Sequence, residues 1–301
     1  MKILVTGATG YIGGSVAKRL VDEGHEVLGL VRDPQKITAL SSLGIKPVLG
    51  TLEDKTTLTQ YALCSDAVIH AADSDHKEAV ETIIEALSGS GKIFIHTSGS
   101  SVIGDDAKGE YASDKIYRDD TPFTPIPIRK TRADLNNFIR MAGITAGIKT
   151  MVITPPMIYG NALGLPAQTD QIPKLIQKSK EEKAGVYIGI GLNRWSNVHI
   201  KDLTDLYSLA LAKGPSGVMF FAENGEESLL TIAKTISRAM GYESKTLSWN
   251  IEDAIQEFGD WARFAIASNS RIKADNARNL LDWKPKEESI LTWIEKVAQT
   301  I

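Results

Sequence analysis

Three glycines near the amino terminus have the spacing of a loop that binds nucleotide phosphates. Gly7, Gly10 and Gly13 follow an apolar run within the sequence VTGATGYIGG. In such a loop the first glycine permits a tight turn, the second lets the backbone approach a pyrophosphate, and the third lets a helix pack closely on the strand. The amino terminus of that helix presents unpaired N–H groups to the anion. The loop residues predicted to contact a dinucleotide are Gly7, Thr9, Gly10, Tyr11, Ile12 and Gly13.

The end of the second predicted strand, Leu30-Val31-Arg32-Asp33, bears on the choice of dinucleotide. An acidic residue about 20 positions beyond the glycines holds the ribose 2′-hydroxyl of NAD, whereas an arginine nearby accommodates the 2′-phosphate of NADP. Val31 occupies the acidic position and Arg32 follows it. The sequence therefore favours NADP, and NAD through Asp33 is the less favoured alternative.

Tyr111 and Lys115 fit the letters of a YxxxK pair. On a helix, residues four apart share a face, so the lysine could lower the pKa of the tyrosine and hold a ribose. The pair lies early in a polar segment, and Pro122, Pro125 and Pro127 separate it from the next predicted helix. A chance surface match is therefore the favoured interpretation, and both residues stay catalytic candidates.

Two further groups of residues have less specific patterns. The run His70-Ala-Ala-Asp73-Ser-Asp75-His76 has metal-like letters, but a strand end followed by a helix cap at Asp75 or Ser74 is the simpler interpretation, and no metal site is expected. No GxSxG sequence is present, so a hydrolase triad lacks its nucleophile elbow. Candidates to line a substrate pocket are Tyr159, Arg194, Trp195, Trp261, Phe264 and Arg271.

The elements that must position these residues alternate between strands and helices. Several strands are continuously apolar, as expected for a parallel sheet covered on both faces. Alternating strands and helices predict a doubly wound sheet. The first-half strands are expected at 2–6, 26–31, 46–49, 67–71, 92–97 and 149–153, with helices near 12–23, 34–43, 55–62, 76–87 and 129–146.

The expected fold class is therefore α/β, a Rossmann doubly wound parallel sheet with a smaller carboxyl-terminal α/β substrate domain. The dinucleotide-binding domain is expected to span residues 1–160 with a return near 192–222. The smaller domain is expected to comprise residues 161–191 and 223–301.

Composition excludes several classes of function. The 301 residues carry 34 Lys+Arg and 37 Asp+Glu, so the basic surplus of a nucleic-acid-binding protein is missing. The single cysteine, Cys64, fits a reducing compartment, and no apolar run has the roughly 18 residues of a membrane span. We expect a cytoplasmic protein with a small-molecule substrate, no nucleic-acid or membrane partner, and compatibility with a homodimer.

Longer motifs carry a resemblance to a known family. VTGATGYIGG at 5–14, VIHAA at 68–72, FIHTSGSSVIGD at 94–105, TPPMIYG at 154–160, NVHIKD at 197–202 and LLDWKP at 280–285 occur in a familiar order. Together they resemble the extended short-chain dehydrogenase/reductase superfamily, which includes sugar-nucleotide epimerases, dehydratases and ketone reductases. The resemblance implies that Ala71 and Thr97 line the cofactor cleft and that Pro155 and Met157 approach the nicotinamide.

The same resemblance shows where the sequence departs from the family. Gly99 stands at the position of the family's serine, with Ser98 beside it, and Ile126 and Lys130 stand at the positions of the tyrosine and lysine. The pattern resembles the atypical branch of the superfamily.

The expected function is NADP-favouring oxidation or reduction of a carbonyl or hydroxyl compound or a nucleotide sugar. Ser98 would polarise the oxygen, with Lys130 or the Tyr111–Lys115 pair assisting. The alternative is a non-catalytic NADP-binding sensor or regulatory module that lacks the tyrosine–lysine pair.

Overall fold

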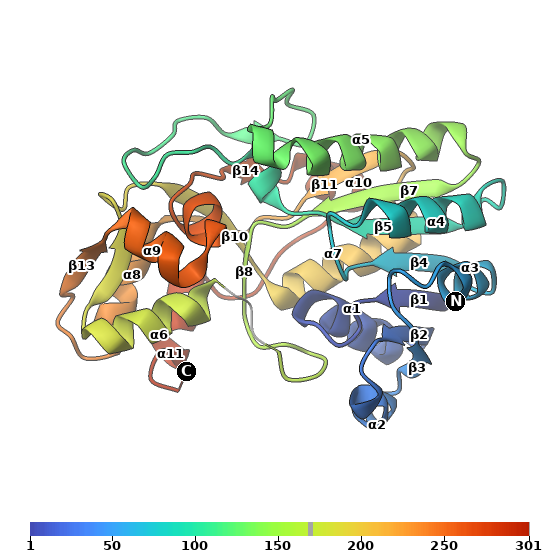
Figure 1. Ribbon diagram of the computed structural model, residues 1–301, viewed down its shortest axis with the longest axis horizontal. Coiled ribbons are helices and arrows are strands. Elements are labelled where there is room, and N and C mark those ends of the chain that lie inside the picture. The colour runs from blue at the N-terminus through green and yellow to red at the C-terminus, as the bar shows by residue number, and fades with distance from the viewer. Residues whose placement is uncertain (168–170, 301) are drawn as a thin grey trace.

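A parallel sheet of seven strands forms the centre of the computed structural model, which describes residues 1–167 and 171–300 (Figure 1). In their order across the sheet, the strands are β11 (Val218–Phe221), β7 (Lys149–Thr154), β5 (Ile93–Thr97), β4 (Ala67–His70), β1 (Lys2–Thr6), β2 (Glu26–Val31) and β3 (Lys46–Leu49). The central strands are almost wholly buried, which explains their continuous apolar runs. The predicted Rossmann fold is confirmed.

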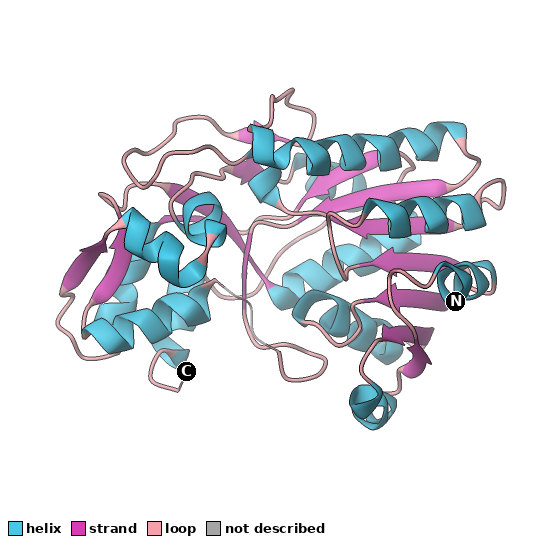
Figure 2. Cartoon of the chain, in the orientation of Figure 1, coloured by secondary structure: helices cyan, strands magenta, loops and turns pink. Residues whose placement is uncertain are grey.

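Helices cover both faces of this sheet (Figure 2). One layer contains α3 (Lys55–Leu63), α4 (Lys77–Leu87) and α5 (Lys130–Thr145), and the other contains α1 (Tyr11–Asp22), α7 (Ile200–Lys213) and α10 (Asp275–Leu281). The short α2 (Ile37–Ser42) lies between β2 and β3 in the chain. Because every strand is parallel, the carboxyl ends meet at one edge, which faces the rest of the molecule (Figure 1).

A second hydrophobic core lies beyond that edge. Its strands are β8 (Met157–Tyr159), β10 (Arg194–His199) and β12 (Glu226–Ser228) in one small sheet, and β9 (Gly185–Ile188) and β13 (Thr246–Trp249) in another. Its helices are α6 (Ile172–Glu182), α8 (Leu229–Ala239), α9 (Ile251–Phe258), α11 (Ile290–Val297) and a π-helix, Ala262–Ile266. We call the seven-stranded part the large lobe and this part the small lobe.

The two lobes exchange chain segments more than once. Strand β11 completes the large sheet, and α10 packs its Ala277 and Leu281 into the first core. Strand β6 (Tyr117–Arg118) pairs with β14 (Ile272–Lys273), and Tyr117 and Ile272 pack in the first core. The strands β6, β8, β12 and β14 were not expected from the sequence, because two or three residues give too short a pattern to recognise. Strand β13 was not expected either.

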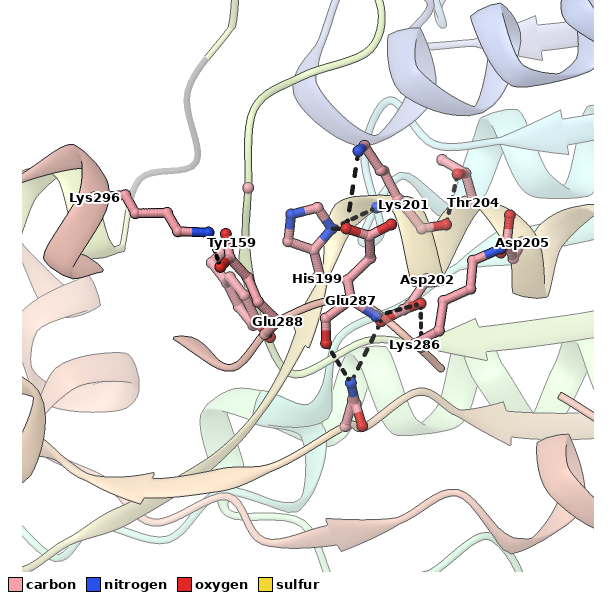
Figure 3. A network of polar contacts seen from close by, with 12 residues as sticks. Tyr159, His199, Lys201, Asp202, Thr204, Asp205, Lys286, Glu287, Glu288 and Lys296 are labelled. Carbon is pink, nitrogen blue, oxygen red and sulfur yellow. Dashed lines mark hydrogen bonds and ion pairs between the residues drawn. The ribbon is translucent and has the colours of Figure 1, made fainter. Parts of the chain in front are cut away.

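A polar network fastens α7 to the segment before α11 (Figure 3). The buried Asp202 carboxylate accepts hydrogen bonds from the backbone N–H of Lys286 at 2.8 Å and of Glu287 at 3.2 Å. The Tyr159 hydroxyl donates to the Glu288 carbonyl oxygen at 2.6 Å. These bonds tie the large lobe to the small lobe beside Gly160.

Among the described residues, no helix combines the length and apolar character that crossing a bilayer requires.

Candidate active site

The glycine loop has the geometry that its sequence predicts. Gly7 adopts a left-handed conformation with φ +72°, and a Cβ there would lie 2.6 Å from the Ala71 carbonyl oxygen. A Cβ on Gly13 would overlap the Gly7 carbonyl oxygen, so the first turn of α1 packs directly on the loop. Gly10 is the amino-terminal cap of α1 and has no capping side chain. The free N–H groups of this helix are therefore available to an anion.

A cleft of about 520 Å³ opens over this loop at the carboxyl ends of β1, β2, β3 and β4. Four segments line the cleft: the glycine loop, the end of β2, residues 50–53 after β3, and the segment after β4. Of the residues predicted to contact the cofactor, those that line it are Gly7, Thr9, Gly10, Arg32 and Ala71. A backbone without side chains beside a helix amino terminus, at the edge of a doubly wound sheet, fits a dinucleotide.

Arg32 is exposed in this cleft, whereas Asp33 is occupied elsewhere. The Asp33 carboxylate accepts a hydrogen bond from the Gln35 N–H at 2.9 Å and caps the turn Pro34–Lys36. The guanidinium of Arg32 is thus the charged group that the end of β2 offers to a ligand.

A buried histidine holds the segment after β4 that forms one wall of the cleft. His70 Nε2 lies 2.9 Å from the Asp73 carbonyl oxygen, which can only accept, so this nitrogen carries the proton. Nδ1 then accepts from the Thr6 hydroxyl at 2.8 Å, and Thr6 Oγ1 accepts from the Ala71 N–H. Burial lowers the pKa of His70 to about 4, which keeps the ring neutral and this pattern fixed.

The other predicted cofactor contacts are not among the residues that line the cleft, and they make contacts within the protein. Tyr11 donates to the Gly160 carbonyl oxygen at 2.8 Å, and Ile12 packs against the first core. Thr97 and Tyr207 share a buried hydroxyl–hydroxyl hydrogen bond of 2.6 Å. The Pro155 carbonyl oxygen accepts from the Ser100 N–H, and Met157 is buried in the second core.

Arg132 lies beside the position that the family serine would occupy. A Cβ on Gly99 would lie 3.5 Å from Arg132 Nη1. Arg132 Nε donates to Asp75 Oδ1 at 2.8 Å, Nη2 bonds the other carboxylate oxygen, and Nη1 donates to Ser101 Oγ at 3.0 Å. The hydrogen bonds from Arg132 lower the pKa of Asp75. This arrangement brings α5, the end of β5 and the segment after β4 together at the carboxyl edge.

Ser98 is buried next to this group. Its Oγ accepts a hydrogen bond of 2.9 Å from the Asn136 side-chain amide, and its backbone N–H donates to Ile153. Because Ser98 Oγ is the acceptor in this bond, its own hydroxyl hydrogen remains available to an acceptor. Asn136 was not predicted, because only the structure shows that this polar residue lies on the buried face of α5.

The structure does not bring Tyr111, Lys115 and Lys130 into this cluster. Tyr111 and Lys115 lie in a non-helical segment, where residues four apart do not share a face, and Lys115 lies over the Tyr117 ring. Lys130 is exposed and its ammonium is 2.6 Å from Asp134.

The structure also bears on the helix cap, the two arginines and the metal-like run that the sequence analysis considered. The cap of α4 is His76, whose Nδ1 accepts from the Ala79 N–H, so a cap at Asp75 or Ser74 is wrong; Asp75 instead binds Arg132. Arg194 and Arg271 both bind Glu226 at 2.7 Å, which neutralises part of their charge. Within residues 1–167 and 171–300, no group of three or more His, Cys, Asp or Glu side chains is arranged to hold a metal ion.

The sequence missed part of the cleft wall. Gly50, Thr51, Leu52 and Glu53 line the cleft from the segment after β3, and Ala72, Asp73 and His76 extend the wall after β4. The segments after β3 and β4 could have been predicted to line the cleft, because the carboxyl ends of neighbouring parallel strands lie at the same edge of a sheet.

Comparisons with known proteins agree with this architecture. The chain is 30% identical over 97% of both chains to an uncharacterised protein of Schizosaccharomyces pombe, and 28% identical to the oxidase ucsJ of Acremonium over 99% of this chain and 97% of that protein. A ketoreductase of Stigmatella aurantiaca acting on a dihydroquinoline oxide is 26% identical over 75% of this chain and 69% of its own length.

Solved structures show the same fold at lower identity. The dTDP-glucose 4,6-dehydratase of Bacillus anthracis, in complex with NAD, superposes with a TM-score of 0.79 at 18% identity, covering 99% of this chain and 96% of that one. The UDP-glucose 4-epimerase of Thermotoga maritima gives 0.78 at 18% identity, covering 99% and 98%. The family profile of NAD dependent epimerases and dehydratases matches residues 3–220. The chain therefore belongs to the NAD dependent epimerase/dehydratase family.

Proposed function

We propose that this protein is an NADP-dependent oxidoreductase that acts on a carbonyl or hydroxyl compound. The observation that carries the proposal is Arg32, a guanidinium exposed in the cleft over the glycine loop while Asp33 caps a turn. A 2′-phosphate requires a positive charge at this place, and the ribose of NAD requires an acid there.

The residues that would hold the dinucleotide lie on three segments. Gly7, Thr9 and Gly10 would bind the pyrophosphate, and Arg32 the 2′-phosphate. Ala71 forms the wall beside them, fixed by Thr6. When bound, a nicotinamide dinucleotide donates or accepts a hydride at the reacting carbon.

Ser98 and Arg132 are the residues proposed to act on the substrate oxygen. Ser98 Oγ accepts from Asn136, so its own hydrogen would bond that oxygen. Arg132, fixed by Asp75, would supply positive charge beside Gly99. This role replaces the one expected of Lys130 or the Tyr111–Lys115 pair, whose charged groups lie outside the cluster.

A non-catalytic NADP-binding module is the second candidate. This candidate is favoured because the resemblance expects a serine and a tyrosine where Gly99 and Ile126 stand, and neither of these two residues carries a hydroxyl. Both candidate functions require that NADP binds in the cleft, but only the oxidoreductase converts a substrate.

The experiment that separates them is a titration with NADPH followed by turnover with a panel of aldehydes, ketones and nucleotide sugars. An oxidoreductase oxidises bound NADPH with at least one compound, and Arg132→Ala lowers kcat without weakening NADPH binding. Binding of NADPH without oxidation by any compound contradicts the enzymatic function and supports the regulatory one.

We also propose that the protein forms a homodimer through α5. Phe138, Met141 and Ile144 follow one another at three-residue spacing along this helix, and their side chains are 41%, 52% and 71% exposed. Such a stripe covers itself when two copies meet. A molecular mass of one chain, measured by sedimentation, would contradict a dimer.

The exposed, unpaired thiol of Cys64 supports a reducing, cytoplasmic location.

A further inference from the structure

Arg129 lies where the two lobes meet, beside the proposed reaction site. It directly precedes α5, so it and Arg132 are three residues apart and share a face. Its guanidinium lies 5.7 Å from the ring centre of Phe264, which belongs to the π-helix of the small lobe. Arg129 is therefore held against the small lobe, whereas Arg132 is held by the large lobe.

The Arg129 guanidinium has no anionic partner among the residues that the structure describes. Its Nε is buried without a hydrogen-bond partner, and within residues 1–167 and 171–300 it makes no hydrogen bond or ion pair. Nine of the eleven arginines of the chain bind a carboxylate or a carbonyl oxygen in this part of the structure. The two exceptions are Arg32, already assigned to a phosphate, and Arg129.

The charges around Arg129 leave the site positive. Asp75 is the nearby carboxylate on the large lobe, and Arg132 occupies both of its oxygens. Asp260 also attracts Arg129, but it is exposed to solvent and makes no ion pair with it. Burial and the charge of Arg132 lower the pKa of Arg129. A bound anion would offset both the desolvation of the guanidinium and its repulsion by Arg132.

We propose that Arg129 binds a carboxylate group of the substrate. This proposal rests on the proposed oxidoreductase function. The substrate class is thus a carbonyl or hydroxyl compound that carries a carboxylate. The guanidinium offers a fork of N–H donors that matches one carboxylate, and Arg132 next to it orients the reacting oxygen.

A carboxylate fits better than a diphosphate. Arg132 has three of its five N–H donors engaged, by Asp75 and Ser101. In the described part of the chain, Arg129 is the guanidinium at this place whose donors are not engaged. Arg263 lies on the same Phe264 ring, but Asp106 binds it. One free guanidinium balances the single charge of a carboxylate and leaves a diphosphate largely uncompensated.

The test measures binding of small carboxylates to the full-length protein saturated with NADP⁺, so that no reduction occurs. Acetoacetate, propanoate and benzoate are titrated by ligand-detected NMR, with methyl acetoacetate as the uncharged probe and UDP as the diphosphate probe. We expect at least one carboxylate to bind on the order of tenfold or more tightly than the ester. Arg129→Gln removes this difference, and Arg129→Lys, which keeps the charge without the fork, retains part of it.

Arg263→Gln is the matched control, because it removes an arginine from the same ring and should leave carboxylate affinity unchanged. Equal binding of acid and ester, no binding of any carboxylate, or tight binding of UDP alone overturns the proposal. NADP⁺ affinity measured on the same samples separates the two claims. Normal NADP⁺ binding without carboxylate binding refutes the Arg129 site alone, whereas no NADP⁺ binding refutes the proposed function.

Discussion

Arg132 binds Asp75 through two hydrogen bonds, one of them 2.8 Å from Nε to Oδ1, although the residues are 57 positions apart in the chain. The pair joins the start of α5 to the segment after β4 that lines the cofactor cleft. It thereby fixes a guanidinium beside Gly99.

Replacing the charge at this place should impair turnover more than cofactor binding. For Arg132→Ala we expect kcat to fall on the order of a hundredfold, as when one oxyanion donor is removed, with an unchanged Kd for NADPH. Steady-state kinetics and a fluorescence titration measure the two quantities. Gly99→Ser is the companion variant: its Cβ meets Arg132 at an ordinary 3.5 Å, so we expect the free energy of unfolding to change by about 0.5 kcal/mol or less. An Arg132→Ala protein with wild-type kcat would refute the role.

Removing the Arg32 guanidinium should abolish the preference for NADPH. For Arg32→Ala we expect NADPH affinity to fall roughly 10- to 100-fold, because one charge-assisted contact to the 2′-phosphate is lost, while NADH affinity stays the same. Calorimetric titration of both dinucleotides measures this. Lys46→Ala, at the amino-terminal end of β3 and paired with Glu26, is the control and should change neither affinity. Retained selectivity in Arg32→Ala contradicts the assignment.

The glycine loop can be tested with two alanine substitutions that differ in steric consequence. A Cβ on Gly10 lies 3.3 Å from the Gly7 carbonyl oxygen, so Gly10→Ala should fold and lose dinucleotide affinity, because the methyl group adds bulk to the cleft. A Cβ on Gly13 overlaps the same oxygen, so Gly13→Ala should also lose about 1–3 kcal/mol of unfolding free energy. Thermal or denaturant unfolding, with NADPH titration, measures both. Equal stability of the two variants would show that Gly13 does not pack as described.

A buried histidine predicts how stability depends on pH. His96 stacks on His70 at a ring distance of 5.4 Å, and burial lowers its pKa well below 6.5. The folded protein keeps His96 neutral while the unfolded chain takes up a proton below pH 6.5, so this contribution is complete above pH 6.5 and is lost as pH falls. His96→Phe keeps the stacked ring, and between pH 7 and pH 5 it should lose about 2 kcal/mol less stability than the wild type.

Denaturant unfolding of both proteins at the two pH values measures this difference. The comparison removes the contributions of the other titrating groups, since they are common to both chains. The same pH dependence in the two proteins would contradict a neutral His96.

The large lobe could be predicted from the sequence because its signals are local. Buried parallel strands such as β1 are short apolar runs, and Gly7, Gly10 and Gly13 occupy one continuous loop. The Arg132–Asp75 and Ser98–Asn136 contacts could not be predicted, because each joins side chains from separate elements that only the sheet order brings together. Tyr111 and Lys115 show the converse, since their letters fit a motif whose helical geometry the chain does not adopt.

The most direct test of the proposed function is NADPH oxidation, followed by absorbance at 340 nm, with a panel of carbonyl compounds, half of which carry a carboxylate. We predict that NADPH binds in preference to NADH and is oxidised by at least one compound. Arg132→Ala should retain binding and lose oxidation. NADPH binding with no oxidation by any compound, and no difference between the wild type and Arg132→Ala, would contradict the enzymatic account.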